Sequence, residues 1–298
     1  MDAPQPKQID IAFITAREMP KPDQETHLIV DAVKGMEMRA DVIPWDSSVD
    51  WAKIPLVVIR SAWDYFKRLP EFLAWARHVD VVSRLVNPYA VVEWNSHKSY
   101  LQQLSRKGVP TVPTILLERG AVENSAHVLS GSGWSEVVIK PAVSIGAIGA
   151  FHTRTEEKAS ADHLESLLAE GDVLVQPFVS SVYIAGEVSM IYFDGEFSHA
   201  IRKLPTAGEY RVQDHYGGTV HPHVPTVEEH GVSTAALAAT PKDTMYARVD
   251  LVSLDDRPVV MELELIEPVL FLSSSPDGTQ RFAEILYSAV GNRANEIA

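Results

Sequence analysis

The chain of 298 residues contains no cysteine. This absence excludes disulfide bonds, catalysis by a thiolate and a zinc site with cysteine ligands. Basic residues are few relative to acidic ones, 26 against 40, so the formal net charge is -14. Because nucleic-acid phosphates require a basic surface, this balance argues against a nucleic-acid partner.

Long apolar runs are also missing. No segment approaches the roughly 20 consecutive apolar residues that a membrane-spanning helix needs. Residues 1–6 lack the basic and apolar regions of a secretion signal. We therefore expect no membrane partner and a cytoplasmic location. The length and a hydrophobic fraction of 46% predict a globular protein of two or three packed subdomains.

Carboxylates recur inside apolar runs near the C-terminal end. Asp250 lies in one such run, and Glu262 and Glu264 lie in the next. Alternate residues of a strand point to one face, and an antiparallel hairpin with its turn at residues 255–258 brings Asp250 beside the two glutamates. Carboxylates this close repel one another unless a cation holds them, and an all-oxygen ligand set suits Mg2+. The alternative is an ordinary amphipathic hairpin whose acids face solvent.

The first 93 residues alternate apolar runs, at 9–15, 42–45 and 56–60, with helical segments. This alternation predicts a parallel sheet in an α/β domain. Ligands of such sheets bind beyond the carboxyl ends of the strands. Arg17 and Arg60 lie at two of these ends, so both are candidates for binding a substrate.

A lysine stands at the end of another predicted strand. Lys140 lies in the run 137–141, and a loop of small residues with Ser144, Gly146 and Gly149 follows it. The backbone N–H groups of such a loop can approach a phosphate closely, while the ammonium group adds positive charge. The spacing is not that of a Walker loop. A plain surface loop is the alternative.

Two further segments have properties that suit a nucleotide. Lys98 lies in residues 94–107, which the sequence predicts as one helix ended by Gly108. Residues 176–179 end a strand where the chain passes between two subdomains. Backbone groups there can pair with the edge of an adenine while apolar side chains cover its faces. An ordinary interdomain linker fits this segment equally well.

The order of these features resembles that of the ATP-grasp superfamily, close to the glutathione synthetase and ribosomal S6 modification branch. The resemblance runs from about Asn87 to the C-terminus. It implies an α/β fold, α+β in its C-terminal half, that uses ATP and two Mg2+ ions. Residues 1–93 are expected to form an N-terminal parallel-sheet domain, residues 94–178 a small central lid subdomain, and residues 179–298 a larger, mostly antiparallel subdomain.

The resemblance also implies roles for single residues. Those expected to bind the nucleotide are Lys98, Lys140, Ser144, Gly146, Gly149, Gln176, Phe178, Val179 and Glu187. The implied metal ligands are Asp250, Glu262 and Glu264, and the last stands where the family usually has Asn, which adds one negative charge. Arg248 is expected to stabilise the transferring phosphoryl group. Arg211 and Lys203, placed in a polar segment between strands, are expected to hold the substrate carboxylate or its phosphate. A solvated loop is the alternative for these two.

The implied reaction is that of a ligase that activates an amino-acid carboxylate as an acyl phosphate for attack by an amine. In size and in its segments 63–65 and 262–268 the chain is similar to the D-cycloserine synthetase type, which closes the ring of O-ureido-D-serine in antibiotic biosynthesis. Glu267 of the second segment joins Arg17 and Arg60 as a substrate candidate. A two-substrate amino-acid or peptide ligase and a non-catalytic ATP-binding regulatory module are the alternatives.

The expected partner is therefore a small amino-acid-like molecule, and a homo-oligomer is left open. Three histidines, His215, His221 and His223, lie within nine positions of one another. They have no further acid or cysteine at the spacing of a zinc site, so we do not expect zinc.

Overall fold

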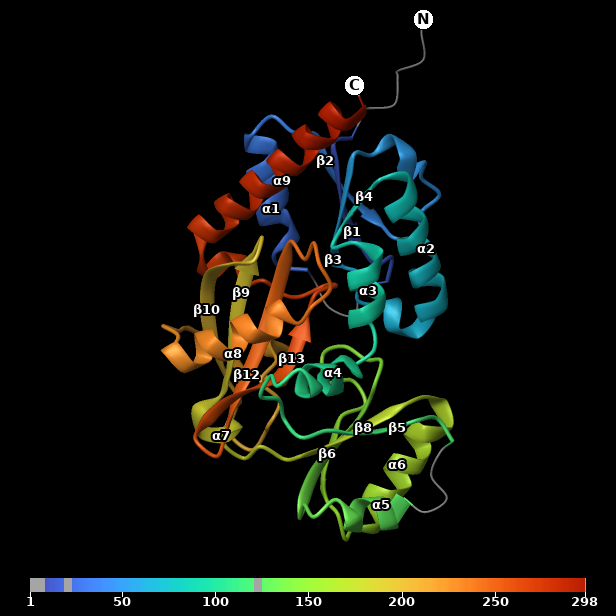
Figure 1. The fold of residues 1–298 in the computed structure, drawn as a ribbon, viewed down its shortest axis with the longest axis vertical. Coiled ribbons are helices and arrows are strands. Elements are labelled where there is room, and N and C mark those ends of the chain that lie inside the picture. The colour runs from blue at the N-terminus through green and yellow to red at the C-terminus, as the bar shows by residue number, and fades with distance from the viewer. Residues whose placement is uncertain (1–8, 19–22, 121–124, 298) are drawn as a thin grey trace, which may run out of the picture.

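The structure, a computed structural model, describes residues 9–18, 23–120 and 125–297. Three sheets account for its architecture. The sheet built last along the chain lies between the other two, with the N-terminal sheet at one end of the long axis and the central sheet at the other (Figure 1). This arrangement brings the central and C-terminal sheets next to each other.

The N-terminal sheet is parallel, as the sequence predicts. Its strand order is β2-β1-β3-β4, formed by β1 (Ile11–Thr15), β2 (Ala40–Pro44), β3 (Leu56–Ser61) and β4 (Arg84–Val86). Every residue of β3 is buried because helices cover both faces of the sheet. One face packs against α1 (Thr26–Gly35) and α9 (Pro276–Ile297), and the other against α2 (Leu69–Val82) and α3 (Tyr89–Asn95).

The central sheet is antiparallel, with the order β5-β8-β6-β7. Its strands are β5 (Ile115–Leu117), β6 (Glu136–Pro141), β7 (Phe151–Arg154) and β8 (Val173–Pro177). Its apolar face packs against α5 (Ser125–Gly131) and α6 (Lys158–Glu170) through a core that includes Leu129, Ile139 and Leu164. The opposite face is left to meet the C-terminal sheet.

The C-terminal sheet has the order β11-β10-β9-β12-β13 and is antiparallel. It contains β9 (Glu187–Phe193), β10 (Glu196–Leu204), β11 (Thr219–Pro222), β12 (Tyr246–Leu254) and β13 (Arg257–Glu264). Also present are α7 (Val182–Ala185), α8 (Val227–Ala238) and the 3-10 helices Trp51–Lys53, Tyr65–Arg68, Asp214–Tyr216 and Leu272–Ser274.

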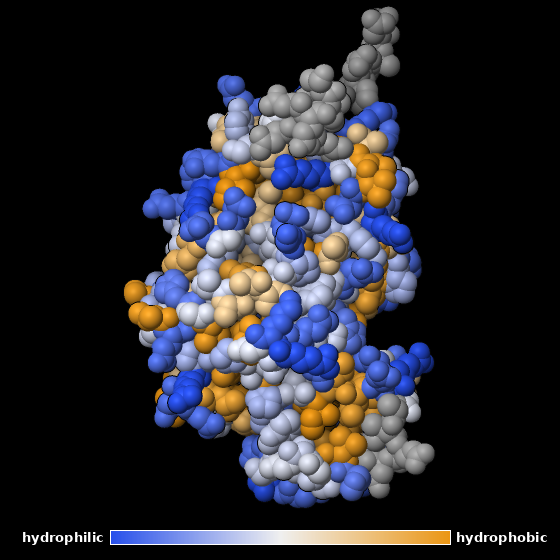
Figure 2. All heavy atoms as spheres, in the orientation of Figure 1, coloured by the Kyte–Doolittle hydropathy of each residue, from blue (hydrophilic) through white to orange (hydrophobic). Residues whose placement is uncertain are grey.

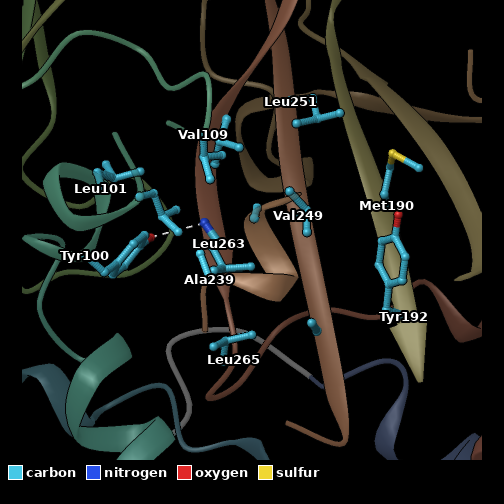
Figure 3. Close-up of a cluster of buried hydrophobic side chains, with 14 of the residues drawn as sticks. Tyr100, Leu101, Val109, Met190, Tyr192, Ala239, Val249, Leu251, Leu263 and Leu265 are labelled. Carbon is cyan, nitrogen blue, oxygen red and sulfur yellow. Dashed lines mark hydrogen bonds between the residues drawn. The ribbon is translucent and has the colours of Figure 1, made fainter. Parts of the chain in front are cut away.

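One face of the C-terminal sheet is apolar. Val249, Leu251 and Leu263 project from it into a core closed by α8 and by α4 (Tyr100–Arg106) (Figure 3). The Tyr100 hydroxyl accepts a hydrogen bond of 3.2 Å from the backbone N–H of Leu263. Because side chains alternate along a strand, this apolar face sends the intervening charged residues to the opposite face.

The predicted helix over residues 94–107 is wrong in one respect. Helix α3 ends at Asn95 and α4 starts at Tyr100, so Lys98 lies in a turn between two helices. Its backbone N–H donates to the carbonyl of Ala142 at 2.9 Å, and the ring of His97 accepts a bond from the backbone of Ser99. Polar side chains of this kind offer the backbone local partners that compete with a helix.

Two helices pack against a different domain from the one to which the sequence assigns them. Helix α4, from residues 94–178, packs on the C-terminal sheet, and α9, from residues 179–298, packs on α1 of the first domain. On the face shown in Figure 2, hydrophilic residues lie over all three sheets and a dense apolar group lies over the central one. Among the described residues, no helix combines the length and apolarity needed to cross a membrane.

Candidate active site

A charged hairpin occupies the middle of the C-terminal sheet. Asp250 of β12 lies opposite Glu262 of β13, and Arg248 lies opposite Glu264. Residues directly opposite in neighbouring strands project to the same side, so these four form one charged face. The predicted hairpin is confirmed. Its turn is shorter than predicted, because residues 255–256 adopt positive φ and the strand resumes at once.

The neighbouring strands add a buried lysine to this face. Lys203 of β10 lies opposite Glu187 of β9, and its ammonium contacts that carboxylate and approaches Oδ1 of Asp250 at 3.5 Å. Ser189 donates a short hydrogen bond to the same Asp250 oxygen. The prediction that Lys203 lies in a polar segment between strands is wrong. Pairing with β9 extends β10 to Leu204, which leaves Lys203 only 5% exposed.

Arg248 holds two carboxylates at once. Its Nε donates to Asp250 Oδ1 at 3.0 Å, its Nη2 to Asp250 Oδ2 at 2.9 Å and also to Glu264, and its Nη1 to the carbonyl of Val269 at 3.0 Å. Burial alone would raise the pKa of Asp250, but Arg248 and Lys203 lower it to about 2. Burial raises the pKa of Glu264 to about 7, although Arg248 acts to lower it.

A cavity lies beside this hairpin, between the central and C-terminal sheets. Its charged end is formed by Lys98, Lys140 and Glu262 with the loop that follows β6. The Lys98 ammonium donates to the Ser144 carbonyl at 2.6 Å and lies 3.2 Å from Glu262. Burial would raise the pKa of Glu262, but Lys98 and Lys140 lower it. Lys98 therefore contacts Glu262 directly, whereas Lys140 acts on it only through its charge.

Lys140 differs from the two buried lysines, Lys98 and Lys203, because it is only partly buried. Within the described part of the chain, its ammonium forms no hydrogen bond or ion pair. Burial lowers the pKa of Lys140, and the nearby charge of Glu262 offsets this only in part. Its charge thus faces the cavity without a direct partner, which suits an anionic ligand.

The other end of the cavity is apolar. Val138, Phe178, Val179, Val182 and Met261 line it. The position of Met261 follows from an irregularity in β13. Asp250 pairs with Glu262 and Leu251 with Val260, so Met261 is the extra residue of a β-bulge. Met261 and Glu262 both face the cavity for this reason.

The segment between β10 and β11 closes the cavity on a third side. Tyr210, Arg211 and Gln213 line it from this segment. The Arg211 guanidinium donates to Glu209 at 2.6 Å and lies 3.6 Å from the centre of the Tyr216 ring. Arg211 therefore does lie in a polar segment at the site, unlike Lys203.

The structure gathers part of the predicted set around the cavity. The predicted residues that line it are Lys98, Lys140, Ser144, Gly146, Gln176, Phe178, Val179, Arg211 and Glu262. The remaining nucleotide candidates do not. Gly149 (φ +77°) packs so closely that an added Cβ would lie 2.9 Å from Pro141, so it shapes the loop, and Glu187 pairs with Lys203.

The sequence interpretation missed part of the apolar lining, namely Val138, Val182 and Met261. The other apolar lining residues, Ile145, Ala147, Ala150 and Pro177, lie in the loop after β6 and in the segment 176–179, both of which the sequence singles out. One missed residue had a signal in the sequence, because Val138 lies two positions before Lys140 on the same strand and shares its face. Val182 and Met261 depend on contacts between distant segments.

The substrate candidates lie toward the N-terminal domain, away from the cavity lining. Arg60 is 2% exposed, and its Nη2 donates to the Pro268 carbonyl at 3.1 Å and lies 3.7 Å from Glu25. Glu25 in turn accepts bonds from the backbone N–H groups of Leu270 and Leu272. Arg60 and Glu25 thus fix the segment after β13 to the first domain.

Glu267 and Arg17 differ sharply in their surroundings. The Glu267 backbone carbonyl accepts a bond of 3.3 Å from the Trp63 indole, while its carboxylate pairs with none of the described side chains. Burial, followed by the charge of Glu264, raises the pKa of Glu267 to about 8. Arg17 is a surface residue, 60% exposed at its side chain and 3.3 Å from Asp46.

The acids of the hairpin suit a hard cation by their chemistry, since Asp250, Glu262 and Glu264 offer only oxygen. Glu262 and Glu264 keep 28% and 27% of their side chains exposed, whereas Asp250 keeps 3%. Among the described side chains, no three acids or histidines stand close enough together to enclose an ion. In this state Lys98 and Arg248 hold the carboxylates.

Comparison with protein families gives two matches along the chain. Residues 94–276 match the RimK-like ATP-grasp domain, and residues 11–87 match the N-terminal domain of D-cycloserine synthetase DcsG. The chain is 35% identical over 288 residues to the cycloserine biosynthesis protein DcsG of Streptomyces lavendulae, covering 89% of this chain and 93% of that protein.

Comparison with solved structures agrees. A crystal structure of D-cycloserine synthetase DcsG superposes with a TM-score of 0.84 at 31% identity, covering 94% of this chain and 99% of that one. A D-alanine–D-alanine ligase from Bacillus anthracis gives a TM-score of 0.65 at 16% identity, covering 97% and 99%. The ATP-grasp ligase PsnB with bound precursor, Mg and ADP gives 0.66 at 14%, covering 95% and 99%. The last two support the fold alone.

Proposed function

Because the chain belongs to the RimK-like ATP-grasp family and is an ATP-dependent ligase that joins a carboxylate to an amine, we propose that ATP binds in the cavity between its central and C-terminal sheets. One observation carries this placement. The cavity is apolar at one end, around Val138 and Met261, and carries Lys98 and Lys140 at the other. A nucleotide has the same division between its base and its phosphates.

The loop after β6 suits the phosphates. Ser144 and Gly146 line the cavity beside the two lysines, so backbone N–H groups and ammonium charge are offered together. Gln176 and Val179 are proposed to flank the adenine. Gly149 and Glu187 are proposed to act indirectly, by shaping the loop and by holding Lys203.

Magnesium is proposed to be held by Glu262 and Glu264, with Asp250 behind them, and two ions remain our expectation. When bound, Mg2+ neutralises phosphate charge and polarises the transferring group. Arg248 donates four hydrogen bonds to Asp250 and Glu264. We propose that it acts mainly by fixing these acids, and that Arg211 is the arginine closer to the reacting groups.

The proposed reaction has two steps. An oxygen of the substrate carboxylate attacks the γ phosphorus of ATP, and ADP leaves. A nitrogen then attacks the acyl carbon of the resulting acyl phosphate, the carbon–oxygen bond to phosphate breaks, and inorganic phosphate leaves. Positioning and charge supply the rate, so the chain needs lysines and an arginine rather than an activated nucleophile.

We propose that the nitrogen belongs to the same molecule, as in the ring closure of O-ureido-D-serine to D-cycloserine. The match of residues 11–87 to the N-terminal domain of D-cycloserine synthetase supports this assignment. Glu267, whose carboxylate lacks a partner among the described side chains, is proposed to hold the substrate ammonium group. Arg60 is proposed to position the segment that carries Glu267. We expect the reaction in the cytoplasm, where ATP and free amino acids occur.

The test is incubation of the protein with ATP, Mg2+ and O-ureido-D-serine, with ADP and cycloserine measured together. Ring closure predicts both products without an added amine. Product only when a second amino acid is supplied would identify a two-substrate ligase. ATP binding without ADP release in any substrate screen would favour a regulatory module. Loss of turnover in Glu262→Ala is expected in either ligase.

A further inference from the structure

A histidine outside the cavity lining stacks on one of its walls. Phe178 lines the apolar end, and the His152 ring of β7 lies against it with 3.7 Å between ring centroids and 18° between planes. His152 of β7 lies opposite Val138 of β6, and Val138 lies opposite Gln176 of β8. Three adjacent strands therefore present His152, Val138 and Gln176 on the same side of the central sheet.

Glu136 connects the two rings. Its side-chain Oε2 lies 2.9 Å from His152 Nε2, and its backbone carbonyl accepts a bond of 2.9 Å from the backbone N–H of Phe178. One residue of β6 thus fixes the ring of His152 and the backbone of Phe178. Arg154 lies 3.8 Å from the same carboxylate, so Glu136 also has a cationic neighbour.

Other aromatic rings enclose the stack. Tyr210 meets His152 at 5.4 Å and Phe178 at 5.8 Å, in both cases nearly edge-on, at 69° and 87°. Tyr183 lies 5.5 Å from Phe178. With His152 against its face and Tyr210 at its edge, the Phe178 ring has one orientation in which it packs on all of its neighbours.

We propose that His152, held by Glu136, is a positioning residue for nucleotide binding that fixes Phe178 as a preformed wall for the base. This rests on the proposed function, namely that ATP occupies the cavity. A preformed wall lowers the ordering that binding must otherwise supply. His152 acts through Phe178 and carries no phosphate contact, so its effect is confined to the base end.

Calorimetric binding of two fragments separates the ends of the site. Adenosine reports the base end and tripolyphosphate the phosphate end, and both are titrated into the full-length protein. His152→Ala is expected to raise the Kd of adenosine by roughly 2- to 12-fold, the value of one aromatic pair, and to leave the Kd of tripolyphosphate unchanged. His152→Phe, which keeps a ring against Phe178, is expected to restore adenosine binding to within about twofold of wild type.

Two further variants distinguish loss of the ring from a general loss of folding. His152→Leu fills the same space without a planar ring and is expected to weaken adenosine binding as His152→Ala does. His78→Ala, an exposed histidine on α2, is the matched control and should change neither affinity. If His152→Ala and His152→Leu bind adenosine as wild type does, or lose adenosine and tripolyphosphate equally, the positioning role is refuted. A wild-type protein that binds neither ATP nor its fragments would instead refute the proposed function.

Discussion

The two ends of the cavity are built in different ways. At the apolar end, rings and aliphatic side chains such as Phe178 and Met261 pack against one another. At the charged end and behind it, acids and bases already pair, as Lys98 does with Glu262 and Arg248 with Asp250. Single replacements at the apolar end should therefore leave the stability of the fold intact, whereas replacements of most charged residues should lower it.

Replacement of a charged residue behind the cavity should have the largest effect, a loss of stability. Lys203→Met leaves Glu187 and Asp250 buried without their ammonium partner. Breaking a buried pair by removing one partner costs about 3–5 kcal/mol, so urea unfolding should show a loss of this size. The control is Lys158→Met, which removes an exposed pair with Asp162 and should cause no measurable change. Equal stability of the two variants would contradict the expected difference between a buried and an exposed ion pair.

Replacement of Lys140, unlike that of its charged neighbours, should lower activity without lowering stability. Its side chain is only partly buried and has no direct partner among the described residues, so Lys140→Met should not destabilise the free protein. Its kcat/KM for ATP should nevertheless fall about 100- to 1,000-fold, the usual effect of losing one charge-stabilising group. Steady-state kinetics and thermal unfolding on the same preparation decide the matter. Full activity, or a large loss of stability, would show that Lys140 has been misplaced.

At the apolar end, Phe178→Ala should weaken the binding of ATP and leave the rate of the chemical steps almost unchanged. Removal of a ring that contacts a base costs about 1–3 kcal/mol of binding, so the KM for ATP should rise roughly tenfold. The kcat at saturating ATP should stay within about twofold, because the ring is remote from the charged end. A fall in kcat with unchanged KM would place Phe178 at the reacting groups and reverse the assignment of the two ends.

The smallest effect should come from Arg17, which belongs to neither end. Its side chain is 60% exposed and its contact with Asp46 is a surface ion pair, which is worth little. Arg17→Ala should change kcat and both KM values by less than about twofold. A rise of tenfold or more in the KM for the amino-acid substrate would instead support Arg17 as a substrate ligand.

The sequence predicts the charged end better than the apolar end, for a physical reason. A carboxylate within a β-like apolar run is rare unless something holds it, so the pattern alone singles out Asp250, Glu262 and Glu264, and the hairpin that carries them is confirmed. Lys140 was visible as a lysine that ends a buried strand. The parallel N-terminal sheet followed from strand and helix alternation in the same way.

The rest depends on contacts that a linear pattern does not contain. Met261 faces the cavity because of a β-bulge, and His152 reaches Phe178 because of the register of three strands. The sequence predicts a polar segment between strands at Lys203 because its strand partner, Glu187, is not apparent from local sequence. Lys98 lies outside a helix because its backbone N–H donates a hydrogen bond to the distant carbonyl of Ala142 and not to a carbonyl of the predicted helix.

The most direct measurement follows an oxygen atom. If the substrate carboxylate is labelled with 18O and incubated with ATP, Mg2+ and the wild-type protein, the acyl phosphate route transfers one labelled oxygen to inorganic phosphate. We predict singly labelled phosphate in step with product formation, and none above background with Lys140→Met. Product formed by the wild-type protein with unlabelled phosphate would contradict the acyl phosphate route.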